Sequence, residues 1–132
     1  MTANNREVDE QANGIDQVKK YIHQNTDQAL DREQLATMAG YSLPHFHCIF
    51  TAEIGENIAA YIRRIRLERA AHKLMAGAVD LTEVAMAAGY QSHAAFSKAF
   101  KQRYGYTPDQ FRKLNFMIAL ETVRKGKPHD KD

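Results

Sequence analysis

The chain has 132 residues, with 18 basic and 16 acidic side chains, a formal net charge of +2 and one cysteine. This length allows one sizeable hydrophobic core or two small ones. A single cysteine excludes an internal disulfide framework, and no apolar run approaches the roughly 18 residues of a transmembrane helix. With a polar, acidic N-terminal stretch, these properties predict a cytoplasmic protein.

The charge is unevenly distributed along the chain. Residues 1–33 carry seven acids against four bases, which leaves 14 of the 18 bases and nine of the 16 acids for the remainder, a net charge of +5. Most of the excess lies in two segments that are predicted below to be helices, 58–76 and 93–104. A concentration of positive charge of this kind is typical of a surface that binds a polyanion such as DNA.

The hydrophobic periodicity predicts an all-α protein of about seven helices and no strands. Residues 1–13 are expected to be disordered, and residues 125–132 to form a polar tail. The helices are predicted, in chain order, over 15–25, 32–39, 43–53, 58–76, 81–88, 93–104 and 108–122.

Several of these helices have recognisable start signals. Asp31 with Gln34 and Asp80 with Glu83 have the spacing of a capping box. The segment Thr107-Pro108-Asp109-Gln110 combines an N-cap, a proline in the first turn and a capping glutamine. These signals predict the starts of the helices at 32, 81 and 108.

One sequence pattern occurs twice in the chain. Leu35-Ala36-Thr37-Met38-Ala39-Gly40-Tyr41 recurs as Val84-Ala85-Met86-Ala87-Ala88-Gly89-Tyr90. After one inserted residue, Gln91, the correspondence resumes with Ser42 and Ser92, Phe46 and Phe96, Phe50 and Phe100, Gly55 and Gly105, and Tyr61 and Phe111. In each copy a small alanine (Ala36 or Ala85) allows a second helix to cross close to the first, a glycine allows the turn, and a serine can cap the second helix. This combination predicts a helix-turn-helix in each copy, whose second helix has an outward face for recognition.

The predicted helix over 58–76 has apolar residues on opposite faces in its two halves. The first set is Ile58, Tyr61, Ile62 and Ile65, and the second is Leu67, Ala70, Ala71 and Leu74. We therefore predict a first helix-turn-helix module over 14–56, a linker helix over 57–77 and a second module over 78–124. A helix of this length spans roughly 28 Å, comparable with one turn of B-DNA at about 34 Å.

These features together resemble the DNA-binding domain of the AraC/XylS family of bacterial transcription regulators, over residues 15–115. The resemblance rests on Leu35-Ala36, Ala39-Gly40-Tyr41-Ser42, His45-Phe46, Ile49-Phe50, Gly55, Tyr61 to Ala70, Val84-Ala85, Ala88-Gly89-Tyr90, Ser92-His93, Phe96 to Lys101, Gly105 to Pro108, and Phe111-Arg112. It implies two three-helix modules, a monomer on an asymmetric double-stranded DNA site, and transcriptional activation beside RNA polymerase. It implies no cofactor.

The resemblance also implies the residues that contact DNA. Base contacts fall on Pro44, His47 and Cys48 in the first module and on His93, Ala94, Ser97 and Lys98 in the second. Phosphate contacts fall on Ser42, Arg63, Arg64, Ser92 and Lys101. The first module departs from the family pattern, since a large aromatic or polar residue is usual at Pro44 and an arginine is frequent at Cys48.

The segment His45-Phe46-His47-Cys48 contains residue types that bind metals or respond to oxidation. Residues two apart on a helix point away from each other, so His45 and His47 cannot chelate one metal ion together. His45 is instead expected to be half-buried near the start of its helix. Cys48 as a redox sensor is disfavoured, because a nearby phosphate raises the pKa of a thiol. No nucleophile and base are paired, which argues against an enzyme.

A protein-interaction module is the alternative function. Phe116, Met117, Ile118, Leu120 and Val123 make the last predicted helix more apolar than a surface helix needs. An anti-regulator on this fold could contact RNA polymerase or a sensing domain without specific DNA readout. An anti-regulator that does not bind DNA would not keep a basic outward face. The present chain has basic residues there, namely Arg63, Arg64, Lys98 and Lys101, so DNA binding is the preferred prediction.

Overall fold

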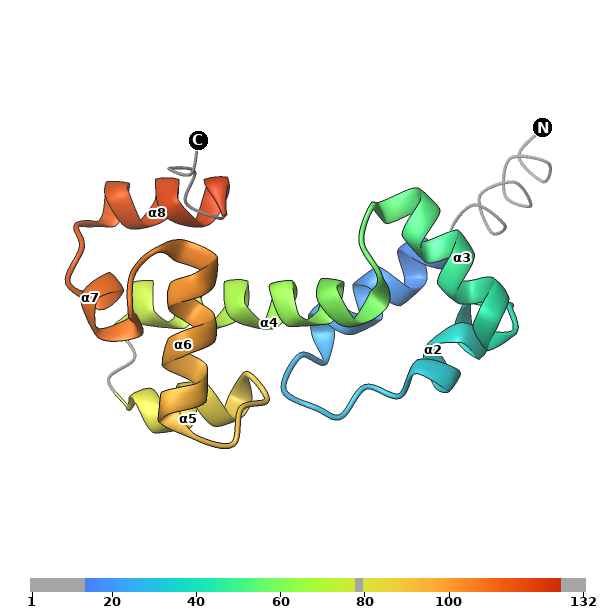
Figure 1. Ribbon diagram of the computed structural model, residues 1–132, viewed down its shortest axis with the longest axis horizontal. Coiled ribbons are helices and arrows are strands. Elements are labelled where there is room, and N and C mark those ends of the chain that lie inside the picture. The colour runs from blue at the N-terminus through green and yellow to red at the C-terminus, as the bar shows by residue number, and fades with distance from the viewer. Residues whose placement is uncertain (1–13, 78–79, 127–132) are drawn as a thin grey trace. The chain divides into compact units, whose positions relative to one another are not determined.

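The computed structural model describes residues 14–77 and 80–126, and all of its regular elements in those ranges are helices (Figure 1). The all-α prediction is confirmed. The chain divides into two compact units, the first ending at Arg63 and the second beginning at Arg64. The disorder predicted for 1–13 lies outside the described residues, as does the tail predicted from 125 apart from its first two residues.

The first unit contains a helix over 14–24, α2 (Arg32–Ala39), α3 (Leu43–Ile54) and the start of α4 (Ile58–Met75). Its buried side chains include Ile15, Val18, Ile22, Leu35, Phe46, Phe50 and Ile58. The rings of Phe50 and Tyr61 meet edge to face with centroids 5.3 Å apart, which fixes the beginning of α4 against α3.

The second unit contains the rest of α4, α5 (Leu81–Ala87), α6 (His93–Tyr104), α7 (Pro108–Arg112) and α8 (Phe116–Lys125). One core cluster joins these helices, with members Leu67, Ala70, Ala71, Leu74, Val84, Ala85, Ala88, Phe96, Phe100, Tyr104, Phe111 and Ala119. In Figure 1, α6 crosses α5, with which it makes direct contact. The first and last helices of the unit thus share one core with the helix-turn-helix.

The duplication extends further toward the N-terminus than the sequence pattern indicated. Buried Ile15, Val18 and Ile22 on the helix over 14–24 have the same spacing as buried Leu67, Ala70 and Leu74 on α4. Each compact unit therefore begins with a helix that presents the same apolar spacing to the helix-turn-helix that follows.

Helix α4 changes its buried face along its length, as predicted. Tyr61, near its start, packs against Phe50 and hydrogen-bonds the ring of His23, with Tyr61 Oη and His23 Nε2 3.1 Å apart. Leu67 and Leu74, further along, belong to the second core. The two compact units divide the chain inside α4, between Arg63 and Arg64. The predicted module limits at 56, 77 and 124 stay predictions.

The single helix predicted over 108–122 is wrong. The chain forms α7 and α8 instead, separated by a break after Arg112. The side chain of Asn115 accepts a hydrogen bond from Ile118 N at 2.9 Å and begins a new helix, while partly buried Leu114 packs on the second core. Asparagine competes well for the N-cap position, so a helix restarts where the apolar periodicity indicated continuity.

Helix α8 is attached to the second core by one side only. Ala119 is buried and Val123 is partly buried, whereas Phe116, Met117, Ile118 and Leu120 are exposed. No helix within the described residues is both long and apolar enough to cross a membrane.

Candidate nucleic-acid interface

The two helix-turn-helix turns have the same main-chain geometry. Gly40 has φ +88° and Gly89 has φ +91°, the left-handed region that favours glycine. The N–H of Tyr41 donates to the carbonyl of Ala36 at 3.0 Å, and the N–H of Tyr90 donates to that of Ala85 at the same distance. This hydrogen bond is the mark of a Schellman motif. Both turns therefore lead into the next helix in the same way.

The second helix of each motif begins at a serine cap. Ser42 Oγ accepts from His45 N at 3.4 Å, and Ser92 Oγ accepts from Ala95 N at 3.1 Å. The first helices are capped by Asp31 and Asp80. Their predicted capping boxes do not form among the described residues, because the exposed side chains of Gln34 and Glu83 make no return bond to the cap.

Helices α3 and α6 expose matching positions. Pro44 and Cys48 are exposed on α3 and His47 is half-buried between them. On α6 the corresponding residues are Ala94 and Lys98, which are exposed, and Ser97, which is half-buried. His93, Lys101 and both cap serines are also exposed. The structure thus gathers the predicted base-contacting residues on one face of each helix, opposite the buried phenylalanines.

His45 differs from its prediction, since it is exposed rather than half-buried. Its ring meets the ring of Tyr41, which belongs to the turn, edge to face with centroids 5.0 Å apart. The imidazole lies on the outer side of the first turn of α3, because buried Phe46 takes the inward position next to it. His45 is therefore added to the candidate interface, although it was not among the residues predicted to contact DNA.

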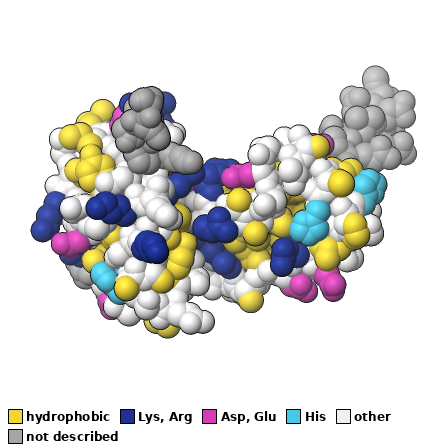
Figure 2. All heavy atoms as spheres, in the orientation of Figure 1, with side chains coloured by type: hydrophobic (Ala, Val, Ile, Leu, Met, Phe, Trp, Pro, Cys, Tyr) yellow, Lys and Arg dark blue, Asp and Glu magenta, His cyan; other side chains and the backbone are white. Residues whose placement is uncertain are grey.

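The two recognition helices carry different charges. Helix α6 contains Lys98, Lys101 and Arg103 and no acid, whereas α3 contains Glu53 and no lysine or arginine. Figure 2 shows basic side chains in dark blue over the second unit and along α4, and histidine side chains in cyan over both units. The second unit therefore offers the stronger attraction to a polyanion.

The two arginines predicted to contact phosphate lie in different surroundings. Arg63 is exposed, whereas Arg64 is half-buried and its Nη1 lies 3.2 Å from Oε2 of Glu68. Arg66, which was not predicted to have a role, lies over the second turn. A Cβ built on Gly89 would be 3.1 Å from Arg66 Nη1. Only spatial proximity reveals this contact, because Arg66 precedes the turn by more than twenty residues.

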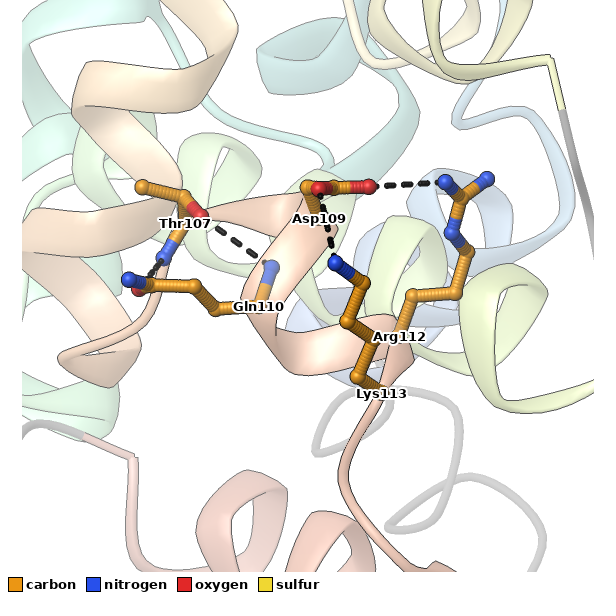
Figure 3. A network of polar contacts seen from close by, with 5 residues as sticks. All are labelled: Thr107, Asp109, Gln110, Arg112 and Lys113. Carbon is orange, nitrogen blue, oxygen red and sulfur yellow. Dashed lines mark hydrogen bonds and ion pairs between the residues drawn. The ribbon is translucent and has the colours of Figure 1, made fainter.

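Helix α7, which packs against α6, is held by a compact polar network (Figure 3). Thr107 Oγ1 accepts from Gln110 N at 3.1 Å and Gln110 Oε1 accepts from Thr107 N at 2.9 Å, which confirms this predicted capping box. A hydrogen bond from Arg112 at 2.7 Å lowers the pKa of the Asp109 carboxyl. These interactions are local to α7, which contacts the recognition helix through the ring of Phe111 against Phe100 and Tyr104.

Two further observations bear on chemistry. Burial raises the pKa of Tyr104, at the end of α6, to about 12, and the nearby charge of Glu68 acts in the same direction. Over the part of the chain that the structure describes, no three or more His, Cys, Asp or Glu side chains come together as ligands for a metal ion.

Comparison with known proteins identifies the family. The family model described as "Helix-turn-helix domain" matches residues 35–114, which include both turns and both recognition helices. The Transposon Tn10 TetD protein of Escherichia coli is 32% identical over 109 residues, which cover 83% of this chain and 78% of that protein. The chain belongs to the AraC-type helix-turn-helix family.

This AraC-type chain also resembles longer regulators. The Msm operon regulatory protein of Streptococcus mutans is 31% identical over 99 residues, covering 75% of this chain but 36% of that protein. The chain thus spans about a third of the length of that relative. Among solved structures, the DNA-binding domain of AdpA in complex with a target DNA aligns with a TM-score of 0.68 and 23% identity, over 74% of this chain and 88% of that one. That likeness supports the fold.

Proposed function

We propose that this AraC-type chain is a sequence-specific regulator of transcription that places α3 and α6 in successive major-groove segments of double-stranded DNA. The observation that carries the proposal is the matched exposure on α3 and α6, where equivalent residues of two equally built helix-turn-helix motifs face outward. A helix presented in this way fits the width of the major groove, where base edges can be read.

The second module has the better side chains for reading bases. His93, Ser97 and Lys98 supply donors and acceptors, and Ala94 supplies a methyl group for apolar contact. In the first module His47 is the polar reader beside Pro44 and Cys48. Phosphate contacts are assigned to Ser42, Ser92, Lys101, Arg63 and Arg64, which position the protein without reading sequence.

The wider setting follows from the family. The AdpA domain is described in complex with a target DNA, which supports double-stranded DNA as the partner. We infer a monomer on DNA, because one chain already carries two recognition helices, and activation through contact with RNA polymerase. The inferred location is the cytoplasm and the inferred action is binding, with no cofactor and no catalysis.

Selection of DNA from a random library by the purified chain tests the proposal. A short asymmetric motif is expected, with more information in the part of the site read by the second module. His93→Ala and Lys98→Ala should each relax specificity at one end of the site, by about 1–3 kcal/mol per base pair contacted. Cys48→Ala is the matched control and should change little, whereas Cys48→Arg should tighten binding. Stronger information under the first module would contradict this assignment.

A second candidate function is supported by α8. Three large apolar side chains, those of Phe116, Met117 and Leu120, are exposed on this helix. Exposed apolar side chains grouped in this way are typical of a surface that contacts another protein. This surface suits contact with another protein, such as RNA polymerase or a sensing domain. If selection enriches no DNA at all, the interaction module becomes the better account.

A further inference from the structure

The first recognition helix lacks the usual sources of attraction to phosphate. Helix α3 has no lysine or arginine, and it carries the acid Glu53. Pro44 has no N–H, and the N–H of His45 is donated to Ser42 Oγ. The first turn of α3 therefore offers fewer free main-chain donors to a phosphate than that of α6, where Ala94 keeps its N–H.

Two imidazoles occupy the surface where those cations are missing. His45 is exposed beside the Tyr41 ring, and His47 is half-buried beside the Phe46 ring, with centroids 6.2 Å apart. Neither imidazole takes part in a hydrogen bond or ion pair within the described residues. The corresponding residues of α6 are Ala95 and Ser97, so the second module has no equivalent pair.

We propose that His45 and His47 are the cationic DNA contacts of the first module and that this module takes up protons when it binds. The proposal rests on the DNA-binding function proposed above. Histidine is the side chain whose charge ordinarily changes between pH 5 and 8. The negative potential of the duplex favours the protonated imidazole, and protonation changes the formal charge of α3 from −1 to +1.

The surrounding groups leave the two imidazoles available. The other titratable or charged residues described in the first unit are Cys48 and Glu53 on α3, Glu56 directly after it, Asp31, Arg32 and Glu33 at the start of α2, Tyr41 in the turn, Asp16, Lys19, Lys20, Tyr21 and His23 on the helix over 14–24, Asp27 after that helix, and Tyr61 and Arg63 on α4. Of these only Tyr41 contacts either imidazole, through its ring. No fixed ion pair has to break before an imidazole meets a phosphate.

Affinity for a duplex selected by this chain, measured by fluorescence anisotropy at constant salt, tests the proposal. Lowering the pH from about 7.5 to about 5.5 should tighten wild-type binding roughly tenfold. In a His93→Gln background, which removes the exposed histidine of the second recognition helix, the variant His45→Gln with His47→Gln should lose most of the remaining change. His72→Gln, which removes an exposed histidine of α4, is the matched control and should keep it.

A fixed charge gives an independent readout at one pH. His45→Lys with His47→Lys should bind more tightly than wild type at about pH 7.5 and should respond little to pH. Circular dichroism at each pH checks that the variants remain folded. If the glutamine variant keeps the full pH response, or the lysine variant gains no affinity, the proposal is wrong. Wild-type protein that binds no DNA at any pH would instead overturn the proposed function itself.

Discussion

Gly40 and Gly89 occupy equivalent turns, but their surroundings differ. Both have positive φ, and a Cβ built on Gly40 would meet nothing within 4 Å. A Cβ on Gly89 would lie 3.1 Å from the guanidinium of Arg66. A left-handed backbone restricts both positions to glycine, and at Gly89 the cation above the turn adds a second restriction.

We expect Gly89→Ala to destabilise the protein more than Gly40→Ala. Each should cost about 1–2 kcal/mol for the left-handed conformation, and Gly89→Ala should cost more because Arg66 must move. In an Arg66→Ala background the excess should vanish. Urea unfolding of the single and double variants measures this coupling. Equal costs for the two glycine substitutions in the native background would show that Arg66 gives way freely.

Features that depend on neighbouring residues could be predicted from the sequence. The cap serines, the turn glycines and the buried phenylalanines follow from neighbouring residues, and the structure places them as expected. The exposure of His45, beside buried Phe46, and the position of Arg66 over the second turn were not predicted. The predicted DNA contacts remain predictions, because surface position alone does not establish what a side chain touches.

At the scale of elements, α4 gave the clearest prediction from sequence. A helix with apolar residues on opposite sides needs a core on each side, whichever fold surrounds it. The division of 108–122 into α7 and α8 was not predicted, because the apolar pattern there does not distinguish one helix from two. Periodicity in that segment is compatible with one helix, and only the cap made by Asn115 decides for two.

Substitutions at the two ends of α4 should loosen different parts of the protein. Ile58→Ala and Leu74→Ala each remove a buried side chain and should cost about 2–4 kcal/mol. Hydrogen exchange should rise mainly within 14–56 for the first variant and within 80–126 for the second. Ala59→Gly, at an exposed position of the same helix, is a control for helix propensity, with a cost of about 1 kcal/mol. The same exchange pattern in both core variants would contradict the division of α4 between two cores.

For the whole molecule, we expect a strong dependence of DNA binding on salt despite the small net charge. Binding through several phosphate contacts releases counterions, so affinity should fall steeply as salt increases. Lys101→Gln should lower the log–log slope by about one unit. Arg63→Gln should act similarly, and Arg64→Gln less, because Arg64 is already paired with Glu68. Lys125→Gln on α8 is the control. A slope of wild-type protein near zero would contradict the assigned phosphate contacts.

The boundary between the compact units has a consequence for dissecting this protein. Because it falls between Arg63 and Arg64, inside one continuous helix, a single cut there leaves each fragment with only part of α4. A fragment that starts at Arg64 lacks the Asn57 side chain, which accepts from Ala60 N at 2.8 Å and caps α4. A fragment that stops there leaves a helix without its C-terminal turns. Fragments designed for the two halves should therefore both include α4. In a chimaera between relatives, the whole of α4 should come from one parent, together with one of the two units.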